Sequence, residues 1–352
     1  MKDYFDKVVL QALSDRSHDI HFKVGQPPIR RVGGTIKRTS ERPLTVKQLD
    51  GIAASILSPT ELDRLQRFGN VDLVYSIPDK CRLRVNIFFQ RNTLAVSVRL
   101  IPPDIPDFRN LGLPPEVQQM LLRIRTGLVL ITGATNSGKS TTMAALIKEI
   151  CFTQSVNVIT VEDPIEFVYP KFPNSVVNQR EVGIDTRRFP DALRSSLRQS
   201  PDILVIGEFR SPEAVLAGLQ AAETGHLVIS TLHTRSAVQT ISRLVNIFPP
   251  HQVEGIRHML ASSLRMVLTQ LLLPSANKKG LTLAFEVLPM QAAIPNLIRT
   301  NRLHEIPNVL NTGTKFGCIS MQSCIDKLIK NNKVDPLDVP SEYLAAKSRP
   351  EG

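Results

Sequence analysis

The sequence of 352 residues has no tryptophan, few aromatic residues (5%) and only four cysteines. The cysteines are Cys81, Cys151, Cys318 and Cys324, and no two of them form a C-x-x-C pair. This spacing favours reduced thiols over a disulfide framework or a zinc site. No apolar run is long enough to cross a bilayer, and the polar N-terminus has no signal-peptide pattern. We therefore expect a cytoplasmic protein.

The charge is strongly basic but scattered. Lys and Arg number 43 against 32 Asp and Glu, which gives a net charge of +11. Such a charge suits an acidic partner, for example a nucleotide, a nucleic acid or an anionic membrane face. The basic residues occur as pairs instead of a tract, and the few aromatic residues offer little stacking surface for single strands. We expect no nucleic-acid partner, although a RecA-like nucleic-acid motor remains an alternative.

One stretch, GATNSGKS at residues 133–140, fits the phosphate-binding pattern G-x-x-x-x-G-K-[ST]. An apolar strand pattern at 128–131 precedes it, and a helix pattern at 142–147 follows. Backbone N–H groups of such a loop face a phosphate at the helix N-terminus. We expect Lys139 to reach the β- and γ-phosphates of ATP and Ser140 to bind Mg²⁺. The candidate nucleotide-binding residues are Gly133, Ala134, Thr135, Asn136, Ser137, Gly138, Lys139, Ser140 and Thr141.

The pattern along the chain predicts two domains of the α and β class. Residues 1–100 are typical of a small α+β domain, and prolines concentrate in residues 101–115, which predicts an extended linker. Residues 116–335 alternate strand and helix, which predicts a mostly parallel sheet covered on both faces. Residues 336–352 are expected to be a frayed tail.

Within the first domain, alternating apolar residues predict strands with one buried face. The expected strands cover 21–24, 29–32, 35–37, 71–75, 83–89 and 94–100, and the expected helices begin near the N-terminus and after Thr45.

Polar residues end the apolar strands of the second domain. Glu162 follows the strand at 158–161, Glu208 follows the strand at 203–206, and His233 ends the strand at 227–232. In open parallel sheets the carboxyl ends of the strands face the ligand. One carboxylate can orient or deprotonate the attacking water, and another can act on the Mg²⁺ water shell.

Two arginines are further candidates for phosphate contact. Arg194 and Arg198 are spaced i,i+4, so a helix would place both on one face. A solvated helix face explains this spacing nearly as well.

Several motifs in order resemble one family. They are residues 17–21 and 25–28 near the N-terminus, 161–167, 178–182, 192–194, 207–210, 222–228 and 231–234. Together they resemble the PilT-like branch of the type II/IV secretion ATPase superfamily, the motors that retract type IV pili. The segments at 161–167, 207–210 and 222–234 resemble its Asp box, Walker B region and His box.

The resemblance implies a PAS-like N-terminal domain, a RecA-like ATPase domain, ATP and Mg²⁺ as ligands, and a homohexamer. It implies that the ring works at the cytoplasmic face of the inner membrane through a platform protein. Glu162 would be the general base, and Glu208 the carboxylate on the Mg²⁺ side. His233 would link the site to the subunit interface with His226 nearby, and Arg84 and Arg99 would reach the nucleotide like arginine fingers.

Presence and absence of further motifs favour the retraction branch, since the sequence has no four-cysteine motif and carries a G-x-x-x-M-Q-S segment at 317–323. Three residues depart from the family pattern: Asn136, Pro295 and Thr300, the last in place of a glutamate. Asn136 replaces a glycine of the loop, and asparagine tolerates a left-handed backbone better than other non-glycine residues. Pro295 replaces an arginine in the segment at 293–300, where a first helical turn would tolerate it best. A secretion or pilus-assembly ATPase, or an accessory retraction subunit, therefore remains an alternative.

Overall fold

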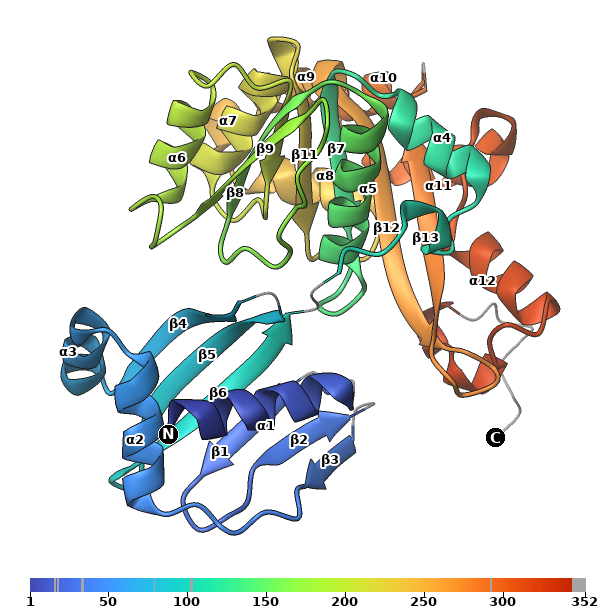
Figure 1. Ribbon diagram of the computed structural model, residues 1–352. Helices are drawn as coiled ribbons and strands as arrows, with labels where there is room; N and C mark the ends of the chain where they lie inside the picture. The colour runs from blue at the N-terminus through green and yellow to red at the C-terminus, as the bar shows by residue number, and fades with distance from the viewer. Residues whose placement is uncertain are drawn as a thin grey trace. The chain divides into compact units, whose positions relative to one another are not determined.

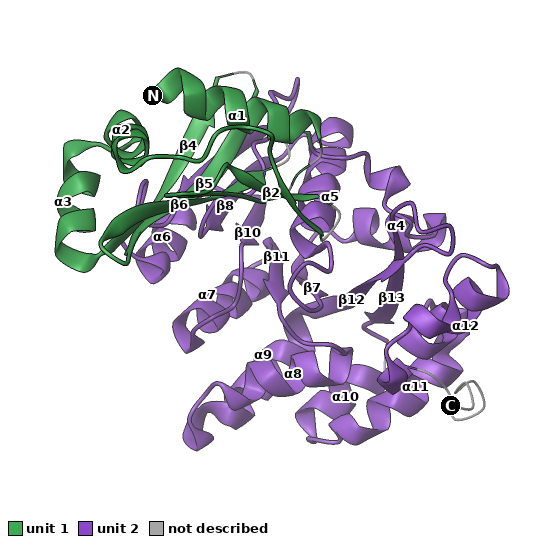
Figure 2. Cartoon of the chain, turned by 90° about the horizontal axis from the view of Figure 1, so that it is seen from below, with its two compact units in different colours: residues 1–104 green, residues 105–352 purple. Residues whose placement is uncertain are grey.

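The computed structural model describes residues 1–15, 17, 19–32, 35–78, 80–101, 104–291 and 293–343. The chain forms two compact units, Met1–Asp104 and Ile105–Gly352, each with its own sheet (Figures 1 and 2). An α+β unit followed by an α/β unit confirms the predicted fold class. His18, Gly33, Gly34, Pro102, Pro103 and residues 344–352, which the predictions used, lie outside the described residues.

Unit 1 is a six-stranded antiparallel sheet in the order β3-β2-β1-β6-β5-β4. Its strands are β1 (Asp19–Lys23), β2 (Ile29–Val32), β3 (Thr35–Arg38), β4 (Asn70–Ile77), β5 (Cys81–Gln90) and β6 (Thr93–Ile101). Leu83, Val85 and Ile87 of β5 are fully buried, which confirms the alternation read from the sequence. Their face packs on the helices α1 (Lys2–Ser14) and α2 (Val46–Ile56).

One helix of unit 1 was not predicted. The helix α3 (Pro59–Phe68) begins with a capping box, in which Ser58 and Glu61 each accept a hydrogen bond from the other's backbone N–H. Pro59 occupies the first helical position, and Gly69 ends the helix with a left-handed backbone.

Unit 2 is a seven-stranded sheet in the order β13-β12-β7-β11-β10-β8-β9, with only β13 antiparallel. Its strands are β7 (Gly127–Thr132), β8 (Asn157–Glu162), β9 (Val176–Glu181), β10 (Ile203–Ile206), β11 (Leu227–Leu232), β12 (Leu264–Pro274) and β13 (Leu281–Pro289). The central strands β7, β10 and β11 are buried at every position, as a sheet covered on both faces requires.

Helices cover both faces of this sheet through two separate apolar clusters. One cluster involves α6 (Phe189–Ser196), α7 (Pro212–Glu223), α8 (Ala237–Asn246), α9 (Val253–Ser263), α10 (Ala293–Arg299) and α11 (Ile306–Thr312). The other involves α4 (Pro115–Arg123), α5 (Lys139–Thr153) and α12 (Met321–Lys330). Pro295 lies in the first turn of α10, the position at which a helix tolerates proline.

The proline-rich segment is not an extended linker over its whole predicted length. Ile105, Phe108 and Leu113 are buried in the core of unit 2, and α4 begins at Pro115. Proline prevents regular structure here, but the apolar side chains between the prolines still pack against the sheet.

The expected frayed tail is also packed as far as Tyr343. Val339 is buried in the same cluster, Lys278 forms an ion pair with Asp338, and Arg235 forms one with Glu342 at 3.3 Å. Polar composition concealed these contacts because a single buried valine gives no periodic signal. No helix within the described ranges has the length and apolar content to cross a membrane.

The capping box at the start of α2 gives a test of what stabilises unit 1. Thr45 accepts a hydrogen bond from Gln48 N–H at 3.3 Å, and the Gln48 side chain accepts one from Thr45 N–H at 2.9 Å. Thr45→Ala should lower the free energy of unfolding by about 1 kcal/mol, measured by urea denaturation. Thr45→Ser keeps the capping hydroxyl, so its free energy of unfolding should equal that of the wild type. Equal stability of Thr45→Ala and wild type would contradict this assignment.

Candidate active site

The loop between β7 and α5 has the backbone of a phosphate-binding loop. Gly133 and Gly138 have positive φ angles of 143° and 86°. A side chain at Gly133 would place its Cβ 2.3 Å from the Gln270 carbonyl oxygen and 2.5 Å from Ser137 Oγ. Only glycine therefore fits at Gly133. Asn136 has a φ of 65°, so the departure from glycine lies at a left-handed position that asparagine tolerates.

Lys139, at the start of α5, is held inside this loop. It is 6% exposed, and its Nζ donates hydrogen bonds to the carbonyls of Gly133 at 2.9 Å and Ala134 at 2.8 Å. Burial lowers the pKa of Lys139, while the charges of Glu208 and Glu166 oppose that shift. An ammonium held this close to the loop is placed to meet a phosphate that the loop binds.

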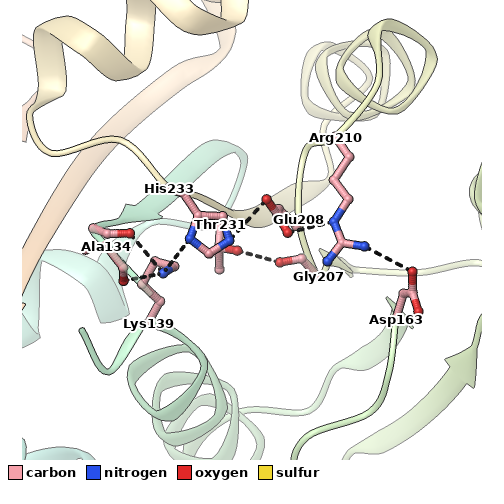
Figure 3. A network of polar contacts seen from close by, with 9 residues as sticks. Ala134, Lys139, Asp163, Gly207, Glu208, Arg210, Thr231 and His233 are labelled. Atoms are coloured by element: carbon pink, nitrogen blue, oxygen red, sulfur yellow. Dashed lines mark hydrogen bonds and ion pairs between the residues drawn. The ribbon is translucent and has the colours of Figure 1, made fainter. Parts of the chain in front are cut away.

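A chain of polar contacts runs from Lys139 across the edge of the sheet (Figure 3). Lys139 Nζ lies 3.3 Å from His233 Nδ1, and His233 Nε2 lies 3.2 Å from Glu208 Oε1. Lys139 can only donate and an ionised Glu208 can only accept. The neutral imidazole with its proton on Nε2 satisfies both neighbours, and we assign that tautomer on these contacts.

Arg210 continues the chain beyond Glu208. Its Nε donates to Glu208 Oε2 at 2.7 Å, and Nη1 lies 3.1 Å from Asp163 Oδ2. The hydrogen bond to Glu208 is the main cause that raises the pKa of Arg210. Sequence reasoning gave Arg210 no role, because only the strand order brings Asp163 and Glu208 to either side of it.

Glu162 has a different environment at the end of β8. It is 9% exposed, and its Oε1 accepts hydrogen bonds from Thr160 Oγ1 at 2.7 Å and Gln179 Nε2 at 3.1 Å. Burial raises the pKa of Glu162, and these two hydrogen bonds partly oppose the shift. Sequence reasoning gave no role to Gln179, which lies on the neighbouring strand β9 and also donates to the Phe167 carbonyl at 2.7 Å.

His226 does not lie near His233. It precedes the first residue of β11, whereas His233 follows the last, so the two are separated by about 20 Å of strand. His226 Nδ1 lies 3.0 Å from the Ala221 carbonyl and 3.1 Å from Thr224 Oγ1. The prediction that His226 lies near His233 is therefore wrong. Nearness in sequence misled it, because a whole strand separates the two histidines.

The arginine candidates divide into two groups. The helix α6 ends at Ser196, so Arg194 and Arg198 do not share a helix face, although both are exposed. Arg84 and Arg99 lie in unit 1, directly opposite one another on β5 and β6. Arg99 Nε also lies 3.0 Å from Asp19 Oδ1.

The loop fits the phosphates of a nucleotide. Gly133 leaves room that any Cβ would fill, Lys139 supplies a cation, and buried Ser137 Oγ has no hydrogen-bond partner among the described residues. For Mg²⁺, Ser140 and Glu208 supply the oxygen donors of the expected kind. The described part of the chain has no cluster of three or more His, Cys, Asp or Glu that could hold a metal.

Comparison with known proteins gives consistent matches. The family described as "Type II/IV secretion system protein" matches residues 1–320. The type IV pilus retraction ATPase PilT of Pseudomonas aeruginosa is 38% identical over 88% of this chain and 90% of its own. A twitching motility protein of Neisseria gonorrhoeae is 37% identical over 88% of this chain and 82% of its own. A crystal structure of the pilus retraction motor PilT with bound ADP is 39% identical, covers 98% of this chain and 96% of its own, and has a TM-score of 0.86.

Gly133 gives a test of the loop. Gly133→Ala should abolish ADP binding in isothermal titration, because its Cβ would collide with the Gln270 carbonyl and Ser137 Oγ. Gly255→Ala is the matched control, since a Cβ there meets nothing within 4 Å inside α9. The control should bind ADP normally and gain about 0.5–1 kcal/mol of stability. Normal ADP binding by a folded Gly133→Ala protein would refute the assignment.

The pKa of Glu162 predicts a pH dependence of stability. Its folded pKa is raised above 4.5, so the stability it contributes is complete below that pH and is lost as the pH rises through the folded pKa. As the pH rises, Glu162→Gln should therefore become more stable than the wild type. Between the unfolded and the folded pKa of Glu162, the difference in free energy of unfolding should grow by about 1.4 kcal/mol for each increase of one pH unit. Calorimetry from pH 4.5 to 8 checks this, with exposed Glu254→Gln as the control. A difference that does not change with pH would contradict it.

Proposed function

Because the chain belongs to the type II/IV secretion system protein family, we propose that it is a Mg²⁺-dependent ATPase whose homohexameric ring drives retraction of type IV pili. The observation that carries this proposal is the edge of the sheet in unit 2. A phosphate-binding loop, a chain of contacts from Lys139 to Glu208, and the separately buried Glu162 all lie at the carboxyl ends of parallel strands. The relatives named PilT and twitching motility protein support the pilus role.

The loop and Lys139 hold the phosphates of ATP in this proposal. Backbone N–H groups at the start of α5 and Ser137 Oγ donate to phosphate oxygens, and Lys139 exchanges loop carbonyls for the β- and γ-phosphates. Ser140 on the loop side and Glu208 would hold Mg²⁺, which would supply positive charge against the phosphates.

Glu162 acts as the general base. Burial raises its pKa toward the working pH, which is the direction that improves a base able to accept a proton from water. Thr160 and Gln179 fix one oxygen of its carboxylate, so the group keeps one orientation. His233 links the loop lysine to Glu208, which makes it the residue through which phosphate contact at Lys139 reaches β10.

Unit 1 supplies the arginines. Arg84 and Arg99 are opposed on neighbouring strands, and we propose that they reach the nucleotide at a subunit boundary of the ring. An arginine that neutralises transition-state charge accelerates phosphoryl transfer by about 10³–10⁵. The ring acts in the cytoplasm, bound to the inner membrane through a platform protein of the pilus machine. Nucleic acid is not a partner in this proposal.

A two-part experiment tests the proposal. Purified protein should hydrolyse ATP with Mg²⁺ and lose this activity with EDTA, and Glu162→Gln should lower kcat by about 10² or more. In cells lacking the gene, surface pili should accumulate and twitching should stop. Wild type and Glu254→Gln should restore retraction, whereas Glu162→Gln should not.

The cellular result also separates the alternatives. Loss of pili in the deletion strain would indicate an assembly ATPase, and unchanged pili with impaired export would indicate a secretion ATPase. Robust hydrolysis by the protein alone would exclude a purely regulatory subunit. Activity in Glu162→Gln equal to wild type would refute the proposed mechanism.

A further inference from the structure

Unit 1 contains a polar cavity of about 500 Å³ that has no part in the ATPase site. Its lining residues come from α1 and the residue after it, from the strands β2 and β3, and from the loop that follows β3. Its lining includes Lys7, Gln11 and Asp15, which are spaced i,i+4 along α1 and share one face. The volume is in the range of sites that hold small organic molecules.

The charge lining the cavity is unbalanced. Four cations, Lys7, Arg30, Lys37 and Arg38, face two carboxylates, Asp15 and Glu41. Both carboxylates already have partners. Asp15 accepts from Arg30 at 2.5 Å, and Glu41 accepts from the Tyr4 hydroxyl at 2.5 Å.

The other three cations have no such partner among the described residues. Lys7, Lys37 and Arg38 form no ion pair or side-chain hydrogen bond within the described ranges. Like charges gathered around a cavity repel one another and raise the local concentration of anions. The cavity is therefore electrostatically prepared for an anion.

Buried donors in the cavity point to a ligand with several acceptor atoms. Arg30 is 9% exposed, and its side chain donates to Asp15 and to Gln11 at 2.9 Å, yet its Nε has no partner among the residues described. Thr39 Oγ1 is likewise buried without a partner there. Buried polar atoms in native proteins nearly always have a hydrogen-bond partner. An arginine Nε–H and a threonine hydroxyl can both donate to a phosphate oxygen.

We propose that this cavity binds a phosphate-bearing ligand, either a free phosphorylated small molecule or the headgroup of an anionic lipid. The core of unit 1 sets its position. Arg30 lies opposite Ile20 on β1 and Lys37 on β3, so the face that is apolar at the centre of the sheet becomes basic at its edge. The cavity is lined by residues of unit 1 alone, and none of them belongs to the proposed nucleotide site.

Binding of inorganic pyrophosphate to the full-length protein tests the proposal. The titration is done with saturating ADP, which occupies the phosphate-binding loop of unit 2. Wild type should bind pyrophosphate, and the exposed double variant Lys37→Gln/Arg38→Gln should bind it about tenfold or more weakly. Lys279→Gln/Lys315→Gln removes the same charge at exposed positions outside the cavity and should bind like wild type.

A second arm distinguishes the two sources of phosphate. Phosphatidylcholine vesicles containing phosphatidylglycerol are tested for co-sedimentation with each protein. Sedimentation lost only in the Lys37→Gln/Arg38→Gln protein supports the proposal and identifies a lipid headgroup. Pyrophosphate binding without sedimentation supports it and identifies a free ligand.

The proposal fails if wild type binds neither probe, or if both double variants weaken binding equally. Glu162→Gln separates this site from the proposed function. It should lose ATP hydrolysis while it keeps pyrophosphate affinity, so either hypothesis can fail alone. The melting temperatures of both double variants should equal that of the wild type. This control shows that the change in affinity does not come from misfolding.

Discussion

The parallel pairing of β7, β11, β10 and β8 is the constraint on which the site depends. Thr132 is level with Leu232, Ser230 with Ile206, and Ile206 with Val161, so the strands end within two residues of one another. Three steps between neighbouring strands span only about 14 Å. Loops that are far apart in the sequence therefore begin side by side, and each contributes a polar side chain to one edge.

The order of the polar contacts repeats the order of the strands. Lys139 follows β7, His233 follows β11, Glu208 follows β10 and Asp163 follows β8, with Arg210 between the last two carboxylates. A displacement at the loop after β7 can therefore be transmitted across the sheet edge through contacts of about 3 Å. Glu162 stays outside this chain, since its partners Thr160 and Gln179 are neutral and come from β8 and β9. The two glutamates thus differ in kind: Glu208 lies among charged groups, and Glu162 is buried among neutral donors.

Local signals in the sequence were sufficient for much of this arrangement. The loop at 133–140, the strands of unit 1, the strands β7, β8, β10 and β11 of unit 2 and the carboxylates after β8 and β10 follow from short patterns, because hydrophobic period and glycine placement are local properties. The strands β9, β12 and β13 were not predicted. Partners across strands were not predictable. Gln179 contacts Glu162 only because β9 pairs with β8, and Arg210 contacts Asp163 only because β10 lies beside β8. His226 shows the opposite error. It is only seven residues from His233 in the sequence, but the strand β11 lies between the two. The packing of 105–113 was hidden because prolines dominate that segment.

On the sheet of unit 1, two exposed arginines on neighbouring strands repel one another, and this repulsion lowers the stability of the sheet. Arg84 and Arg99 are direct cross-strand neighbours, and like charges in that position destabilise a sheet. On the other side of Arg99 lies Asp19, whose carboxylate is 3.0 Å from Arg99 Nε and 3.7 Å from Arg31 Nε. The Asp19 carboxylate thus lies within ion-pair distance of two arginines, Arg31 and Arg99. Arg84 forms no ion pair within the described ranges. Arg99 thus faces the acidic Asp19 across β1 and the like charge of Arg84 across β5. In the proposed mechanism both arginines meet the phosphates of a bound nucleotide, and that contact would offset the repulsion between them.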